Sequence, residues 1–127
     1  MKIKLNNLIR LLLNIHKSLL DLEKASYEAK NGVISNNQEY FNLVINHEDF
    51  KWLRALSEII ALIDEESERN NIDNKKIKDI VAGLSQLLTE DKDNEFSLRY
   101  LFALENNRDL FKLDEALKEA IKDILND

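Results

Sequence analysis

Residues 2–31 read KIKLNNLIRLLLNIHKSLLDLEKASYEAKN, and their apolar side chains recur at the spacing typical of an α-helix, with no proline or glycine to interrupt it. The following pair, Asn31 and Gly32, is typical of a helix end with a left-handed glycine, and Val33 is placed for the apolar contact that often accompanies it. We therefore expect one helix roughly 40 Å long. Since a compact chain of 127 residues has a radius of gyration of about 14 Å, one end of this helix should project or be covered by a second subunit.

The rest of the chain predicts further helices, because it holds no proline and only two glycines for tight turns. We expect helices over about 36–46, from a cap at Asn46 or His47 to about Arg69, from a cap at Asp73 to a break at 91–94, over 96–107, and over about 109–125. The first of these begins at a capping box on Ser35 and Gln38, but its β-branched residues would also suit a strand. The sequence thus predicts an all-α fold: a single-domain bundle of five or six helices over residues 1–127, built on the long N-terminal helix.

The charge balance argues against nucleic acid as a partner, because 24 acidic residues outnumber 18 basic ones and give a net charge of −6. The absence of cysteine excludes disulfides and thiolate metal ligands and suits a reducing compartment. Polar residues interrupt the apolar run near the N-terminus, and no stretch approaches the roughly 18 apolar residues of a membrane span. We expect a cytoplasmic protein with no signal peptide and no membrane partner.

Five polar residues lie in or beside helix faces that are expected to pack in the hydrophobic core. His16 and Glu23 fall inside the apolar sector of the first helix, about 10.5 Å apart along its axis. Arg54, Ser57 and Asp64 line one flank of the third helix. If the two flanks meet, Glu23 would pair with Arg54, and His16 with Asp64. This candidate polar site is either a buried network that fixes the helix register or a site for small-molecule binding or proton transfer, in which His16 titrates near neutral pH.

Other chemistry receives little support from the residue spacing. His16 and His47 lack the i, i+3 or i, i+4 ligand partners of a helical metal site, so we expect no metal. Because Lys17 and Ser18 follow His16, the segment resembles histidine phosphotransfer domains, but leucines surround His16 where those domains have small residues and a nearby glycine. There is no glycine-rich phosphate loop, nucleophile motif or cofactor fingerprint, so we expect no cofactor.

The N-terminal helix also offers a candidate interface. Its apolar residues cover more of the helix than one neighbouring layer can bury; they include Leu5, Leu8, Ile9, Leu12 and Leu13. Large exposed apolar patches usually mark interfaces. Our leading hypothesis is therefore a non-catalytic interaction or regulatory protein that self-associates through this helix or binds a protein partner.

Three segments carry a family resemblance: HKSLLDLEKASYE from His16, FKWLRALSEIIALIDE from Phe50 and RYLFALENN from Arg99. Together they resemble a family of small, uncharacterised bacterial helical proteins. The resemblance spans most of the chain, including the candidate polar site, and implies an all-helical fold with no assigned function to carry over. Relatives have Asp-Pro before the second segment and after the third, whereas this chain has no proline, so its helices must begin at side-chain caps.

Overall fold

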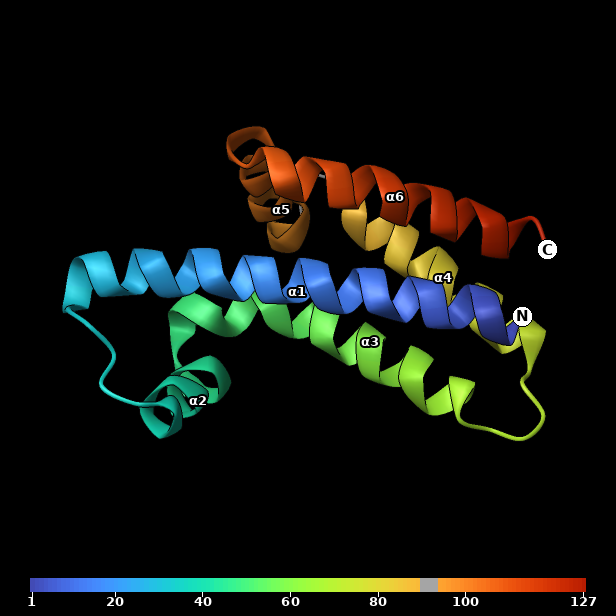
Figure 1. Ribbon diagram of the computed structural model, residues 1–127, viewed down its shortest axis with the longest axis horizontal. Helices are drawn as coiled ribbons and strands as arrows, with labels where there is room; N and C mark the ends of the chain where they lie inside the picture. Colours follow the sequence, from blue (N-terminus) through green and yellow to red (C-terminus); the bar gives the residue numbers. More distant parts are fainter. Residues whose placement is uncertain (90–93) are drawn as a thin grey trace.

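The computed structural model describes residues 1–89 and 94–127, and within these ranges the chain is helical, with no strand. The helices of these ranges are α1 (Lys2–Asn31), α2 (Asn37–Asn46), the 3-10 helix η1 (Glu48–Leu53), α3 (Arg54–Ser67), α4 (Asn74–Leu88), α5 (Glu95–Asn106) and α6 (Arg108–Leu125), shown in Figure 1. The predicted all-α class is confirmed, and α1 is the longest of the six α-helices in the described residues.

The end of α1 falls at the predicted glycine. Gly32 has a φ of 88° and a ψ of 169°, a conformation essentially restricted to glycine but more extended than the expected left-handed one. The predicted contact of Val33 is wrong, because this side chain is 83% exposed, whereas Ile34 is buried. The Glu28 carboxylate accepts a hydrogen bond from the Ile34 N–H at 2.8 Å. The residue that packs against the protein after the helix end is therefore Ile34, one position after the expected Val33.

The segment 37–46 is a helix, so the alternative of a strand is wrong. Its cap is Asn36 rather than Ser35: the Asn36 Oδ1 accepts from the Glu39 N–H at 2.8 Å. The Glu39 carboxylate in turn accepts from the Ser35 N–H at 3.2 Å. The cap is therefore shifted by one residue, and it is Glu39 rather than Gln38 whose side chain reaches back to the segment before the helix.

The predicted third helix consists of two pieces. His47 caps its start as expected, with Nδ1 accepting from the Asp49 N–H at 3.0 Å. Residues Glu48–Leu53 are wound as a 3-10 helix, and α3 follows without a break and ends at Ser67 rather than near Arg69. Because a 3-10 helix has 3.0 residues per turn instead of 3.6, the side chains of η1 point in directions that differ from those of a single α-helix.

Side-chain caps also start the last three helices. The Asp73 carboxylate accepts from the Lys76 N–H at 3.1 Å, as predicted. Asn94 caps α5 and Asn107 caps α6, so each helix begins one residue earlier than expected. Of the predicted break at 91–94, residues 91–93 lie outside the described residues.

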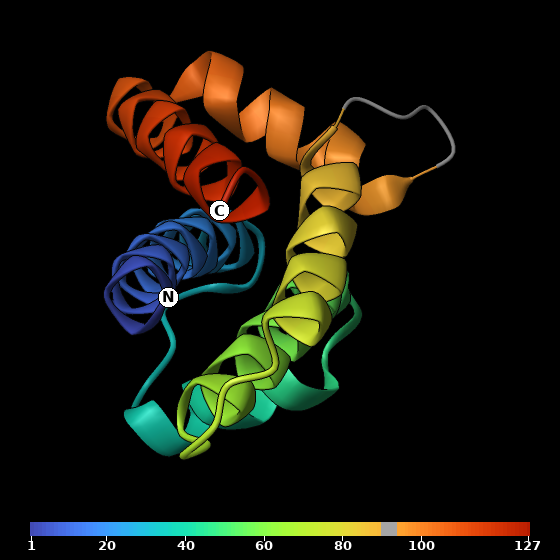
Figure 2. The same ribbon diagram turned by 90° about the vertical axis from the view of Figure 1, so that its right-hand side faces the viewer.

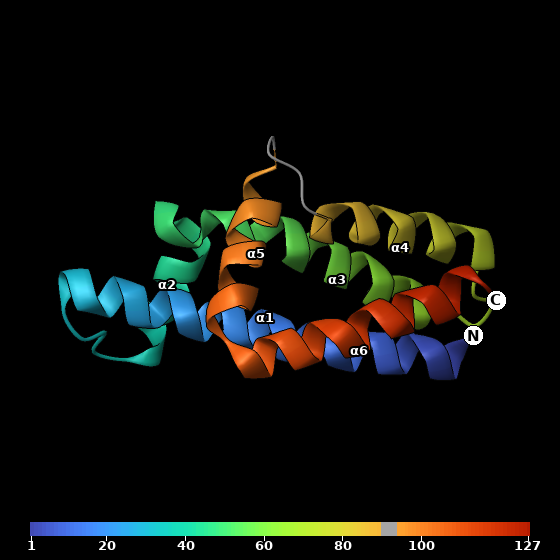
Figure 3. The ribbon, with the colours of Figure 1, turned by 90° about the horizontal axis from the view of Figure 1, so that it is seen from above.

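The helices α1, α3, α4 and α6 contact one another in a ring, and α5 crosses one end of it (Figure 2). α3 runs antiparallel to α1 (Figure 1), and the C-terminal part of α1 extends beyond the start of α6 (Figure 3). η1 packs against this extending part, and α2 packs against η1. The C-terminal part of α1 is therefore not covered by α6, which packs along the rest of this helix.

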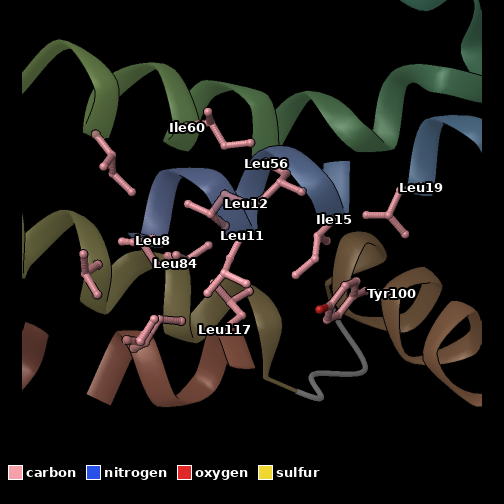
Figure 4. Packing of buried hydrophobic residues seen from close by; sticks show 14 of the residues in the cluster. Leu8, Leu11, Leu12, Ile15, Leu19, Leu56, Ile60, Leu84, Tyr100 and Leu117 are labelled. Carbon is pink, nitrogen blue, oxygen red and sulfur yellow. The ribbon is translucent and has the colours of Figure 1, made fainter. Parts of the chain in front are cut away.

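The inside of the ring is filled by one hydrophobic cluster drawn from α1, η1, α3, α4, α5 and α6 (Figure 4). Leu5, Leu8 and Leu12 are fully buried in it, so the predicted interface is wrong for these three residues. The physical reason is that α1 is packed on two sides, by α3 and by α6, rather than by one neighbouring layer. Of the other two residues, Ile9 is half-buried and Leu13 is exposed.

Candidate functional site

Three of the five predicted polar residues line one pocket. His16 of α1 lies there with Arg54 and Ser57 of α3, in a hollow of about 310 Å³. Its walls are apolar and come from α1, α2 and η1: Leu20, Val44, Ile45, Phe50 and Leu53. We call this hollow the His16 pocket.

The predicted ion pairs of this site are wrong. Glu23 does not pair with Arg54 but with Arg99 of α5, at 3.5 Å. Asp64 is exposed and does not meet His16, because α3 runs antiparallel to α1 and seven residues carry Asp64 about 10 Å beyond Ser57.

Two polar side chains of the His16 pocket are held by hydrogen bonds to backbone carbonyls. The Arg54 Nη2 donates to the Ile45 carbonyl at 2.9 Å, and the Ser57 hydroxyl donates to the Arg54 carbonyl at 3.0 Å. The His16 ring is half-buried, and burial lowers the pKa of its imidazole below the ordinary value. At neutral pH His16 is therefore mainly uncharged, and Arg54 is the charged side chain among the residues that line the pocket.

A second hollow, of about 430 Å³, lies on another side of α1, between the extending part of that helix and α5. Its lining comes from α1, η1, α5 and the start of α6: Leu19, Leu22, Glu23, Ser26, Trp52, Leu98, Arg99, Phe102, Ala103, Asn106 and Asn107. We call it the α1–α5 groove. Three of its large apolar side chains, Leu22, Leu98 and Phe102, remain exposed.

A paired set of charges crosses the α1–α5 groove. The Glu23 carboxylate accepts from the Trp52 indole N–H at 3.3 Å and faces the Arg99 guanidinium at 3.5 Å. Arg99 also lies over the Trp52 ring, 5.7 Å from its centroid, and pairs with Glu95 at 3.2 Å. The Glu23 carboxylate therefore links α1, η1 and α5 across the groove through its two partners.

Sequence reasoning missed the groove because two of its elements could not be placed. The sequence predicts one continuous third helix, whereas Trp52 lies on the 3-10 helix η1 and is half-buried at the groove. Arg99 was not a candidate, because nothing in the local sequence shows that α5 crosses α1. The apolar pattern of the predicted helix over 96–107 runs nearly all the way round and indicates a central helix or one at an interface, but it does not show which helix α5 crosses.

Two buried carboxylates were also missed. Asp114 of α6 accepts from the Tyr100 hydroxyl at 2.7 Å and pairs with Lys118 at 2.9 Å. Glu66 accepts from the Asp73 N–H at 3.1 Å, and this backbone hydrogen bond is the main reason why the pKa of Glu66 lies below its ordinary value. Both interrupt an apolar stripe at helical spacing, which is a signal that the sequence does contain.

Within residues 1–89 and 94–127, no group of three or more His, Cys, Asp or Glu side chains is arranged to hold a metal ion. In the same ranges, none of the helices combines the length and the apolar character that a membrane crossing requires. No family model, curated protein or solved structure matches the chain.

Proposed function

We propose that this chain is a non-catalytic, cytoplasmic interaction module, a single-domain helical bundle over residues 1–127 that binds a second copy of itself through the α1–α5 groove. The observation that carries the proposal is the gathering of exposed apolar side chains at one hollow. Leu22, Leu98 and Phe102 meet there, and Phe102 keeps 68% of its surface exposed. Exposed apolar patches of this kind usually mark interfaces.

The shape of the patch favours a second copy as the occupant. An interface related by a twofold axis uses the same patch on both subunits, so the patch must be complementary to itself. The α1–α5 groove gives the patch a concave part, and Phe102, which lines the groove and is 68% exposed, gives it an apolar side chain that the second copy can cover. Phe111 is another exposed aromatic side chain on α6, at 49%, and it lies one helical turn after the groove residue Asn107.

The charges of the patch are compatible with self-association. The chain as a whole carries a net charge of −6, so most faces of two copies repel each other. Within the groove the charged side chains are Glu23 and Arg99, which neutralise each other. Two copies that meet at this patch therefore bury apolar surface without bringing unpaired like charges together.

The test is the molar mass in solution, measured by size-exclusion chromatography with light scattering. The wild-type chain should run at twice the 14.8 kDa of one copy at micromolar concentration. Phe102→Glu should run as the monomer. Because a twofold interface contains Phe102 twice, a loss of about 2 kcal/mol at each copy weakens the dimer about 1,000-fold.

The matched control is Phe41→Glu on α2, because Phe41 is 66% exposed and lies outside the α1–α5 groove. This variant changes the charge and removes the same exposed ring, and it should remain a dimer. A monomeric wild-type chain at these concentrations would overturn the proposal. So would a Phe102→Glu variant that stays dimeric, because association would then use another face.

A further inference from the structure

The His16 pocket shares no lining residue with the α1–α5 groove, so the proposed self-association does not account for it. Five of its eight lining residues are apolar, and the other three are His16, Arg54 and Ser57. Its volume of about 310 Å³ lies at the small end of the range in which proteins hold small molecules. The pocket therefore has room for a small ligand with one polar end.

The polar end of the pocket is suited to an anion. Arg54 uses its Nη2 on the Ile45 carbonyl, and a guanidinium has five N–H donors, so others remain for a ligand. His16 makes no hydrogen bond to the residues that the structure describes, and its imidazole adds one donor when neutral and two when charged. No carboxylate is among the eight lining residues, so a negative ligand meets no like charge there.

We propose that the His16 pocket binds a small monocarboxylate with an apolar body, the carboxylate on Arg54 and His16 and the carbon chain on Leu20, Val44 and Phe50. Arg54 recognises the carboxylate because guanidinium and carboxylate groups match in a planar, bidentate geometry. The apolar walls select for the carbon chain, because acetate would leave them uncovered.

Binding of a carboxylate should be coupled to protonation of His16. Burial lowers the pKa of this ring in the free protein, and an anion beside it raises that pKa again. The charged group that shares the pocket with His16 is Arg54 of α3. Lys17 and Asp21, which lie on α1 with His16, are exposed and pair with each other at 4.0 Å. Affinity for the carboxylate should therefore increase as the pH falls from neutrality through the pKa of His16.

The experiment is an NMR titration of the His16 imidazole with sodium hexanoate, with acetate and hexanamide as comparison ligands. Added hexanoate should shift the His16 resonances, and this shift should saturate as the hexanoate concentration rises. Acetate lacks the carbon chain and hexanamide lacks the charge, so each should bind at least about tenfold more weakly. Hexanamide binding as tightly as hexanoate would overturn the proposal, because the pocket would then be a simple apolar cavity.

Two arginine variants locate the site. Arg54→Gln removes the guanidinium from the pocket and should weaken hexanoate binding at least about tenfold. Arg10→Gln is the matched control, because Arg10 is also exposed but lies on α1 outside the pocket, where it donates to Asn7. Equal affinities of the two variants would overturn the proposal, as would the absence of a saturable shift at His16 in a wild-type chain with a well-dispersed spectrum.

Discussion

Removal of the Tyr100 hydroxyl tests how the buried carboxylate on α6 is stabilised. Tyr100 is 1% exposed, and its hydroxyl donates to Asp114 at 2.7 Å. Tyr100→Phe deletes this one hydrogen bond but keeps the aromatic ring, which stacks on Phe96 at 5.6 Å between centroids. Asp114 keeps its ion pair with Lys118 at 2.9 Å, so the carboxylate loses one of two partners rather than both.

The size of the effect at neutral pH follows from the charge of the acceptor. A hydrogen bond to a charged group contributes about 1.5–3 kcal/mol to the free energy of unfolding, so we expect Tyr100→Phe to lower that energy by about 2 kcal/mol. For a chain of 127 residues this corresponds to a decrease in Tm of about 7 °C.

The effect should shrink in alkaline solution. Burial, and then the hydrogen bond and the charge of Asp114, raise the pKa of Tyr100, so the folded protein keeps this proton while the unfolded chain releases it near pH 10. The unfolded state then binds fewer protons than the folded state, and the free energy of unfolding falls as the pH rises. At pH 11 this loss amounts to about 1.4 kcal/mol in the wild type and is absent in Tyr100→Phe, so the difference between the two should narrow to about 0.6 kcal/mol.

Urea unfolding followed by circular dichroism at neutral pH and at pH 11 measures both quantities. Tyr27→Phe is the control at neutral pH, because the Tyr27 hydroxyl makes no hydrogen bond within the described residues, and its loss should change the free energy of unfolding by less than about 0.5 kcal/mol. The reasoning is refuted if Tyr100→Phe is as stable as this control, or if its difference from the wild type is the same at both pH values.

Two further predictions concern the core and the end of α1. Leu12→Ala should lower the free energy of unfolding by about 3 kcal/mol, because Leu12 is fully buried. Leu13→Ala should change it by less than about 1 kcal/mol, because Leu13 is 52% exposed. Similar urea midpoints for the two variants would contradict the packing of α1. Gly32→Ala should destabilise the chain by about 2 kcal/mol, because no other residue adopts its φ of 88° without strain, while Gly83→Ala inside α4 should be neutral or stabilising by up to about 1 kcal/mol. Thermal unfolding checks this second pair, and a stabilising Gly32→Ala would show that the helix end has another conformation.

Features that depend on neighbouring residues could be predicted from the sequence. The cap at Asp73 joins atoms that are three residues apart, and the end of α1 depends on one glycine, so local patterns contain the relevant chemistry. The winding of η1 could not be predicted, because 3-10 and α-helices have similar residue preferences and tertiary packing decides between them.

The candidate site was predicted in part for the same reason. Arg54 and Ser57 share a face because they are three residues apart on one helix, and the antiparallel course of α3 brings that face to His16. The partner of Glu23 could not be found in this way. It is Arg99, 76 positions later in the sequence, and only the crossing of α5 over α1 brings the two together.

The packing of α1 between α3 and α6 also affects the synthesis of the chain. A ribosome makes α1 first and α6 last of the helices described, and at about 5–20 residues per second the intervening segment takes roughly ten seconds. Helical domains fold within microseconds to milliseconds. The side of α1 that α6 covers therefore stays open for thousands of folding times in every round of translation, and during that interval its leucines are available to chaperones and to other nascent chains.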